Sequence, residues 1–237
     1  MKRILFSIAL LILSSMACGV PPSSSLPTQT QNTVATVVTE SPTVSLTSTP
    51  DPFCENTILC LRFNGQTESD FGVPYDIKFK QENGTLALFR ETTGFGEIQF
   101  PQLRIDEIVF FEAKISLDSD ISGEPGAQIH IENSDWWLSC SINGSPQRSQ
   151  AACYTSDGYY QKASTVKHNE WHTLRFEVDP DTAVISFFFD GQKFGSYITP
   201  LNRKMFKETY VTPGIGVLSR EDGLVTGYFE DVRIGQR

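Results

Sequence analysis

The sequence WHTLRFEVDPDTAVISFFFDGQKFGSY, residues 171–197, decides the fold of this chain. Apolar and polar residues alternate along it, and the alternation is interrupted at residues 179–182 (DPDT) and at Asp190-Gly191. Alternation with a period of two is typical of β-strands. Proline presets one turn dihedral and glycine supplies a positive one, so both interruptions predict tight hairpins. The stretch therefore predicts three consecutive antiparallel strands.

The same alternation recurs along most of the chain after residue 52. In residues 107–117, Phe111 and Ile115 face one way, whereas Glu112 and Lys114 face the other, where they suit an ion pair. Residues 53–237 are enough for the core of one sandwich domain, and no internal repeat is visible. Further strands are predicted at residues 58–63, 85–90, 96–100, 127–132, 136–142, 152–155, 214–218 and 226–234, with one short helix at residues 201–207.

Several of these runs carry a resemblance to a known group of folds. Residues 169–178 (NEWHTLRFEV), 185–194 (ISFFFDGQKF) and 227–235 (GYFEDVRIG) resemble the second half of concanavalin A-like, or laminin G-like, jelly rolls. Residues 83–88 (NGTLAL) are similar to part of the first half. The group includes plant lectins, laminin G modules, family 16 glucanases and domains of the 3-keto-disaccharide hydrolase type. The resemblance implies an all-β fold, a two-sheet antiparallel jelly-roll sandwich, but no particular activity.

The first residues are typical of an export signal. Residues 1–17 combine a basic tip, an apolar run and small residues before Cys18. The apolar run is about half the ~20 residues that a membrane-spanning helix needs. The small residues before Cys18, with Gly19 after it, resemble the lipobox of bacterial lipoproteins, in which the cysteine is acylated and becomes residue one. We expect a protein held to a bacterial membrane by this lipid, at the cell surface or in the periplasm; the alternative is ordinary secretory cleavage, which would leave Cys18 as a thiol.

Residues 18–52 form a second region of distinct composition. They are rich in Ser, Thr and Pro, have no aromatic residue and carry only the charges of Glu40 and Asp51. Such a segment cannot bury a core, so it is predicted to be a disordered tether. The formal charge of the whole chain is −9, and removal of Lys2 and Arg3 with the signal takes it to −9 − 2 = −11. This charge excludes nucleic acid as a partner.

The cysteines indicate disulfides. Of the five, Cys18 is assigned to the lipid, which leaves Cys54, Cys60, Cys140 and Cys153 free to pair. Three pairings are formally possible. Cys54 and Cys60 are close in sequence, and a hairpin turning near residue 146 would place Cys140 opposite Cys153. We therefore favour the two local pairings.

The sequence contains no recognisable catalytic motif. The resemblance to family 16 glucanases would imply a Glu-x-Asp-x-x-Glu run along one strand, and none occurs. His168 and His172 lack the spacing and the helical setting of a zinc-protease motif. The acidic residues Asp118, Asp120 and Glu124 are candidate calcium ligands, with a solvated acidic loop as the alternative, and we expect no other cofactor.

Aromatic side chains provide the main indication of function. Two tryptophans and three tyrosines lie between residues 136 and 160, and alternation allows only one of Trp136 and Trp137 to face outward. Flat aromatic rings bind the C–H faces of sugars, and amides and hydroxyls bind the sugar hydroxyls. We therefore expect a non-catalytic carbohydrate-binding domain with a glycan or another cell-surface ligand as partner. One alternative is that the aromatic residues only pack in the core. Two others are a protein-binding scaffold and a glycoside hydrolase, and the hydrolase would need a carboxylate converging with His130 in a concave pocket. The expected binding residues are Gln128, His130, Trp137, Ser139 and Tyr154.

Overall fold

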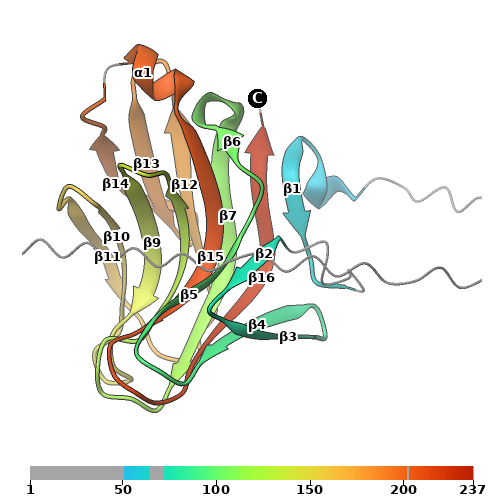
Figure 1. The fold of residues 1–237 in the computed structure, drawn as a ribbon, viewed down its shortest axis with the longest axis vertical. Coiled ribbons are helices and arrows are strands. Elements are labelled where there is room, and N and C mark those ends of the chain that lie inside the picture. Colours follow the sequence, from blue (N-terminus) through green and yellow to red (C-terminus); the bar gives the residue numbers. More distant parts are fainter. Residues whose placement is uncertain (1–50, 65–71, 202, 237) are drawn as a thin grey trace, which may run out of the picture. The chain divides into compact units, whose positions relative to one another are not determined.

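The protein is a β-sandwich of two antiparallel sheets, as Figure 1 shows. This is a computed structural model, and it describes residues 51–64, 72–201 and 203–236. Residues Ser48–Arg237 form one compact unit. The predicted all-β sandwich is confirmed. The predicted signal at residues 1–17, the lipid site at Cys18 and the tether up to residue 50 lie outside the described residues.

The first layer, which we call the β7 sheet, is built around the long strand β7 (Ile108–Ser119), which contains all but the first residue of the strand predicted at residues 107–117. Strand β7 lies between β12 and β16 at its centre, and the hairpins at residues 179–182 and 190–191 join β12, β13 and β14 as predicted. Its strands, in order across the sheet, are β14 (Gln192–Ile198), β13 (Val184–Phe189), β12 (His172–Asp179), β7 (Ile108–Ser119), β16 (Val225–Gln236), β4 (Thr85–Arg90) and β3 (Lys78–Glu82), with β1 (Thr57–Leu61) also paired to β16.

The second layer, which we call the β8 sheet, carries the functional face described below. Strand β15 lies between β8 and β5 and so joins two parts of the chain that are far apart in sequence. The strands in order are β11 (Tyr160–Thr165), β10 (Gln150–Thr155), β9 (Trp137–Asn143), β8 (Gly126–Glu132), β15 (Tyr210–Ser219), β5 (Gly94–Gln99) and β2 (Val73–Tyr75), with β6 (Leu103–Arg104) paired to β15. The helix α1 (Arg203–Glu208) and the 3-10 turns η1 (Pro52–Cys54) and η3 (Ile105–Glu107) complete the described elements.

The core lies between the two sheets and follows the predicted alternation. On β7, the side chains of Phe111, Ala113 and Ile115 are buried, whereas Glu112 and Lys114 lie on the outer face. Phe111 contacts Phe176 of β12 edge to face, with ring centroids 5.6 Å apart. Full burial of a large apolar side chain contributes roughly 1.5–3 kcal/mol each, so these inward rows provide most of the stabilisation.

Strands β2, β3, β6 and β11 were not predicted from the sequence. Strand β3 (KFKQE) and strand β11 (YQKAST) lie at the edges of their sheets, and each has a largely polar, exposed composition. An edge strand buries little apolar surface, and its polar residues protect the open edge from pairing with another chain. The apolar alternation that marks central strands is therefore weak in them.

Two disulfides form with the pairing that the sequence favours. Cys140 on β9 lies directly opposite Cys153 on β10, both sulfurs face the core, and the Cα atoms are 4.1 Å apart. Cys54 is bonded to Cys60 across the turn that precedes β1. Disulfides form in oxidising compartments, so the domain matures outside the cytoplasm. Among the described residues, no helix has the length and apolar composition of a membrane span.

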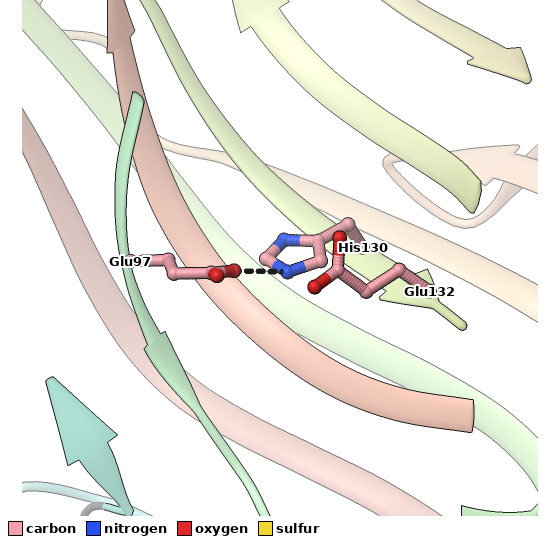
Figure 2. A group of neighbouring side chains, drawn as sticks. All are labelled: Glu97, His130 and Glu132. Atoms are coloured by element: carbon pink, nitrogen blue, oxygen red, sulfur yellow. Dashed lines mark ion pairs between the residues drawn. The ribbon is translucent and has the colours of Figure 1, made fainter. Parts of the chain in front are cut away.

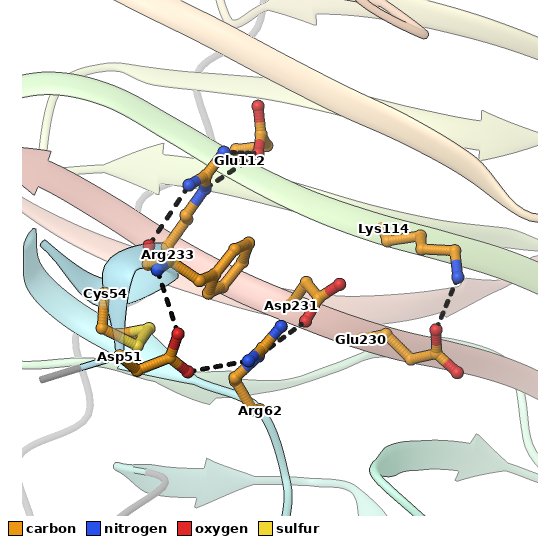
Figure 3. Close-up of polar contacts among 10 residues, drawn as sticks. Asp51, Cys54, Arg62, Glu112, Lys114, Glu230, Asp231 and Arg233 are labelled. Atoms are coloured by element: carbon orange, nitrogen blue, oxygen red, sulfur yellow. Dashed lines mark hydrogen bonds and ion pairs between the residues drawn. A yellow bond between two sulfur atoms is a disulfide. The ribbon is translucent and has the colours of Figure 1, made fainter. Parts of the chain in front are cut away.

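A network of charged side chains fastens the start of the domain to the β7 sheet (Figure 3). Arg233 of β16 donates to Glu112 with Nη2–Oε1 at 2.6 Å, and it also donates to the backbone oxygen of Phe53 at 3.3 Å. Arg62 donates to Asp51 at 2.7 Å. The expected pair of Glu112 with Lys114 does not form, because Arg233 takes Glu112. Lys114 instead pairs with Glu230, at 2.7 Å.

Candidate active site

A groove runs along the outward face of the β8 sheet. Its volume is about 810 Å³. Strands β8, β9 and β10 each turn alternate residues toward it, because successive side chains of a strand point to opposite faces. All five residues expected to bind glycan line this groove: Gln128, His130, Trp137, Ser139 and Tyr154.

These five residues differ in how far they reach into solvent. Trp137 is 41% exposed, whereas its neighbour Trp136 is buried in the core, so one of the two tryptophans faces outward as alternation requires. His130 and Ser139 are each only 2% exposed and lie in the floor. The Tyr154 hydroxyl is hydrogen-bonded to Ser141 and Asn143, and burial raises the pKa of this phenol. This part of the groove therefore has an exposed aromatic side chain, Trp137, above a polar floor that includes His130 and Ser139.

Glycines of β15 open the floor of the groove beside His130. Gly214 pairs with His130 of β8, and a Cβ atom at Gly214 would lie 2.6 Å from the His130 Nε2 atom. Gly216, two residues further, is covered in the same way by the ring of Phe95. Because no side chain rises from these glycines, the imidazole can cross β15 toward β5. There, His130 Nε2 lies 2.6 Å from Oε2 of Glu97.

A second carboxylate completes this cluster, shown in Figure 2. Glu132 lies two residues after His130 on β8, so it points to the same face. The Gln99 amide donates to Oε1 of Glu97 at 2.8 Å and to Oε1 of Glu132 at 3.2 Å, and so it holds both carboxylates. One atom each of Glu97, His130 and Glu132 lie within 4.8 Å of one another. The structure thus places two carboxylates around one imidazole.

The sequence prediction missed Glu97, Glu132 and Gln99. One signal for Glu132 was present, since Gln128, His130 and Glu132 alternate along a predicted strand and must share a face. Glu97 and Gln99 show the same alternation on β5. The sequence contains no sign that β5 and β8 lie on either side of β15, because that order depends on the topology of the whole sheet.

A second hollow begins where the groove reaches Glu132. It has a volume of about 640 Å³, and Glu132 lines both this hollow and the groove. Tyr210, 54% exposed, lines the second hollow, and Tyr160, 51% exposed, lines the groove with Trp137. A chain molecule lying across both hollows would therefore contact exposed aromatic rings on each side of Glu132.

The candidate calcium ligands are arranged differently. Asp118 accepts a hydrogen bond from Asn169 at 3.3 Å, and Glu124 pairs with Arg220 at 3.1 Å. Among the described residues, the cluster of Glu97, His130 and Glu132 is the one group of three potential metal ligands found within 4.8 Å, and it includes none of Asp118, Asp120 and Glu124. Neither His168 nor His172 lines the groove. His168 contacts the backbone oxygen of Gly144, a lining residue, at 3.0 Å, and His172 pairs with Asp190 at 2.9 Å.

No family model and no curated protein matches this sequence. Solved structures do match. The fold is a concanavalin A-like jelly roll. A laminarinase from Flavobacterium sp. UMI-01 has a TM-score of 0.56 at 10% identity, covering 76% of this chain and 100% of that one. SCLam, a non-specific endo-β-1,3(4)-glucanase from family GH16, has a TM-score of 0.55 at 12% identity, covering 76% and 90%. The Crh5 transglycosylase in complex with NAG has a TM-score of 0.55 at 14% identity, covering 76% and 86%.

These findings overturn the expectation of a non-catalytic binding domain. The similar structures named here are glycan-cleaving or glycan-transferring enzymes, although at 10–14% identity the likeness itself shows only the fold. The local observation beside them is that the buried Glu97 lies 2.6 Å from His130, a residue of the groove floor, a convergence that the sequence did not reveal. Among the expectations from the sequence, these comparisons agree better with the alternative of a glycoside hydrolase than with a binding domain.

Proposed function

We propose that this protein is a glycoside hydrolase that acts within a glycan chain bound along the β8 sheet. The observation that carries the proposal is the convergence of Glu97 and Glu132 around His130. Glu132 lies where the groove meets the second hollow, and Glu97 is buried beside His130. A chain bound across this point would present a glycosidic bond to Glu132, with an oxygen of Glu97 within 4.8 Å of that carboxylate. The aromatic rings of Trp137, Tyr160 and Tyr210 would support the sugars on either side.

The spacing of the carboxylates favours a retaining mechanism. Retaining enzymes place their two carboxyl groups about 5 Å apart, whereas inverting enzymes leave roughly 6.5–9.5 Å for a water molecule. Oxygens of Glu97 and Glu132 lie within 4.8 Å of each other. Glu132 is the more exposed, so it attacks the anomeric carbon and forms a glycosyl ester. Glu97 protonates the leaving oxygen and then takes the proton of the incoming water, or of a second sugar hydroxyl if the enzyme is a transglycosylase.

Two further parts of the proposal concern where the enzyme works and what it cleaves. An acylated Cys18 followed by the predicted tether at residues 18–52 would hold the domain away from a bacterial membrane, within reach of glycans at the cell surface or in the periplasm. The resemblance to 3-keto-disaccharide hydrolases extends the candidate substrates to oxidised disaccharides. Calcium at Asp118, Asp120 and Glu124 remains a prediction.

The test is a set of carboxylate variants assayed on defined glycans. The purified protein is incubated with β-1,3-glucan, mixed β-1,3/1,4-glucan, NAG oligosaccharides and 3-keto-disaccharides, and products are followed by mass spectrometry. Glu132→Gln and Glu97→Gln should each lower kcat at least 100-fold, since each removes a group that bonds to the substrate or transfers its proton. Glu177→Gln, a strand-borne glutamate on the β7 sheet, is the matched control and should retain activity.

Two results would contradict the proposal. The first is the absence of any product from this panel, and the second is a Glu132→Gln variant that cleaves as fast as the original protein. NMR of the first anomer released tests the mechanism separately, because retention is expected and inversion would rule out the roles given to the two carboxylates.

A further inference from the structure

We propose that Glu97, His130 and Glu132 also form a binding site for a divalent metal ion, and that zinc is the ion that suits them best. One imidazole with two carboxylates is a ligand set that zinc accepts, and three protein ligands leave a fourth position open. Figure 2 shows the three side chains directed toward a common point, Glu97 from β5 and the other two from β8.

The distances suit one ion. Ligands at about 2.1 Å from a tetrahedral zinc lie roughly 3.4 Å apart. The three candidate atoms already lie within 4.8 Å of one another. The pair of Glu97 Oε2 and His130 Nε2, now 2.6 Å apart, would open by less than an ångström. Rotation of the side chains is therefore enough, and the strands need not move.

The atoms at the centre of the cluster lack other partners. In the described part of the chain, Glu97 Oε2 and both imidazole nitrogens of His130 have no hydrogen-bond partner of acceptable geometry, although Oε2 and Nε2 are close enough for an ion pair. The two side chains are only 5% and 3% exposed. Buried polar atoms without partners are rare in folded proteins, and each one calls for an explanation. A metal ion between them would satisfy the carboxylate oxygen and the Nε2 atom of the imidazole together.

Charge supports the same conclusion. Within the described residues, neither Glu97 nor Glu132 has an ion pair with a lysine or an arginine; Glu97 contacts the imidazole of His130, and the Gln99 amide is neutral. When both are ionised, two carboxylates held close together in a shielded site repel each other unless a positive charge lies between them. A divalent cation balances both.

The surroundings of the cluster hold it in a geometry suited to a ligand. The Gln99 amide donates to Oε1 of each carboxylate, which leaves the Oε2 atoms for the metal. Such outer hydrogen bonds orient metal ligands. The ring of Phe95 packs edge-on against the imidazole at 5.6 Å and limits its rotation.

The consequence for activity rests on the proposed function. An ion that binds both carboxylates leaves neither free to attack the sugar or to transfer a proton. Zinc would then inhibit glycan cleavage and would be released when a stronger chelator is present. Binding of the ion is a separate claim, and it can be measured without any substrate.

The experiment measures zinc binding to the purified protein by isothermal titration with ZnCl₂ after treatment with EDTA, with MnCl₂ as a second probe. We expect one zinc ion per chain. His130→Asn and Glu132→Gln should each weaken binding at least 100-fold, and Gln99→Leu should weaken it 10- to 100-fold because the ligands remain but lose their orientation. His172→Asn is the matched control, since His172 also lies between two carboxylates, Glu170 and Asp190, on the β7 sheet.

The outcomes test the metal site and its inhibitory effect separately. Absence of zinc and manganese binding, or binding that His172→Asn abolishes and His130→Asn does not, overturns the metal site. Circular dichroism identifies any variant that has failed to fold; Glu132→Gln, at a half-buried position, keeps the test valid if His130→Asn does not fold. Cleavage in EDTA that zinc suppresses in step with its occupancy supports inhibition. Zinc binding without cleavage in either condition supports the site and contradicts the hydrolase, whereas cleavage unaffected by bound zinc overturns inhibition alone.

Discussion

Substitution of Gly214 by alanine tests the geometry of the cluster directly. The added Cβ would lie 2.6 Å from both Cε1 and Nε2 of His130, and 3.0 Å from the backbone oxygen of Ile98. Carbon atoms in contact normally lie about 3.5–4.0 Å apart, so the imidazole must move by about 1 Å. It would then leave its position 2.6 Å from Glu97.

The expected loss of stability is small, and the expected loss of activity is large. Overpacking of this kind costs about 1–3 kcal/mol, and the lower entropy of the unfolded alanine chain offsets roughly 0.4–1 kcal/mol. A net loss of about 1.5 kcal/mol lowers the Tm of a domain of this size by roughly 3–6 °C. Because the imidazole lies against Glu97, its shift would disturb the position of that catalytic carboxyl group, and displacement of a catalytic group by about 1 Å can cost on the order of 100-fold in rate.

The assay pairs differential scanning calorimetry with the rate of glycan cleavage. Gly126→Ala on β8 is the control, because its Cβ would lie 3.4 Å from Asn143, close to an ordinary contact, and its Tm and rate should be unchanged or slightly higher. If Gly214→Ala keeps both the Tm and the rate of the original protein, the placement of His130 over the glycine is not what supports the site.

Other predictions concern the disulfide, the aromatic platform and a buried tyrosine. Replacement of both Cys140 and Cys153 by alanine opens a loop with a sequence separation of 13 and should cost about 3 kcal/mol in urea unfolding; an equal midpoint would contradict this. Trp137→Ala should raise KM about three- to tenfold with a stability change within about 0.5 kcal/mol, and an unchanged KM would remove Trp137 from the binding face. Burial and the hydrogen bond to Asp157 raise the pKa of Tyr197 to about 12. Tyr197 ionises near pH 10 in the unfolded chain but not in the folded one, so the free energy of unfolding should fall as the pH rises from about 10 to 12. Tyr197→Phe should make this decrease smaller, as measured by urea unfolding at each pH. An equal decrease in the variant would exclude Tyr197 as its source.

The central strands were predictable because burial on one face leaves a period of two in the sequence. The rows on β7 and the hairpin at Asp190-Gly191 have this signal, and the structure contains both. The edge strand β3 has only a weak period of two, because none of its side chains is buried and most positions are therefore not restricted to apolar residues. Periodicity reports the environment of a single strand, and for that reason it identified the elements of the core more readily than those of the rim.

Only those residues of the site that alternate within a predicted strand could be identified from the sequence. Alternation placed Gln128, His130 and Trp137 on one face, and they do line one groove. Glu97 comes from β5, and its approach to His130 depends on β15 lying between the two strands and on Gly214 having no side chain. Neither condition can be read from local sequence, so the carboxylate that changes the functional interpretation was not found.

The attachment of β1 determines how the domain would bear mechanical load. A pull on the N-terminal end of the chain reaches Cys54 and passes through its sulfur bridge to Cys60, so it bypasses the first residues of β1. The force then reaches the pairing of Leu61 with Val232 on β16, a strand joined to β7 along most of its length. A peeling motion that would open β1 one residue at a time from Thr57 is thereby blocked by a covalent bond. A load from the N-terminal side of the domain therefore enters through the β7 sheet, whereas the groove is lined by the β8 sheet.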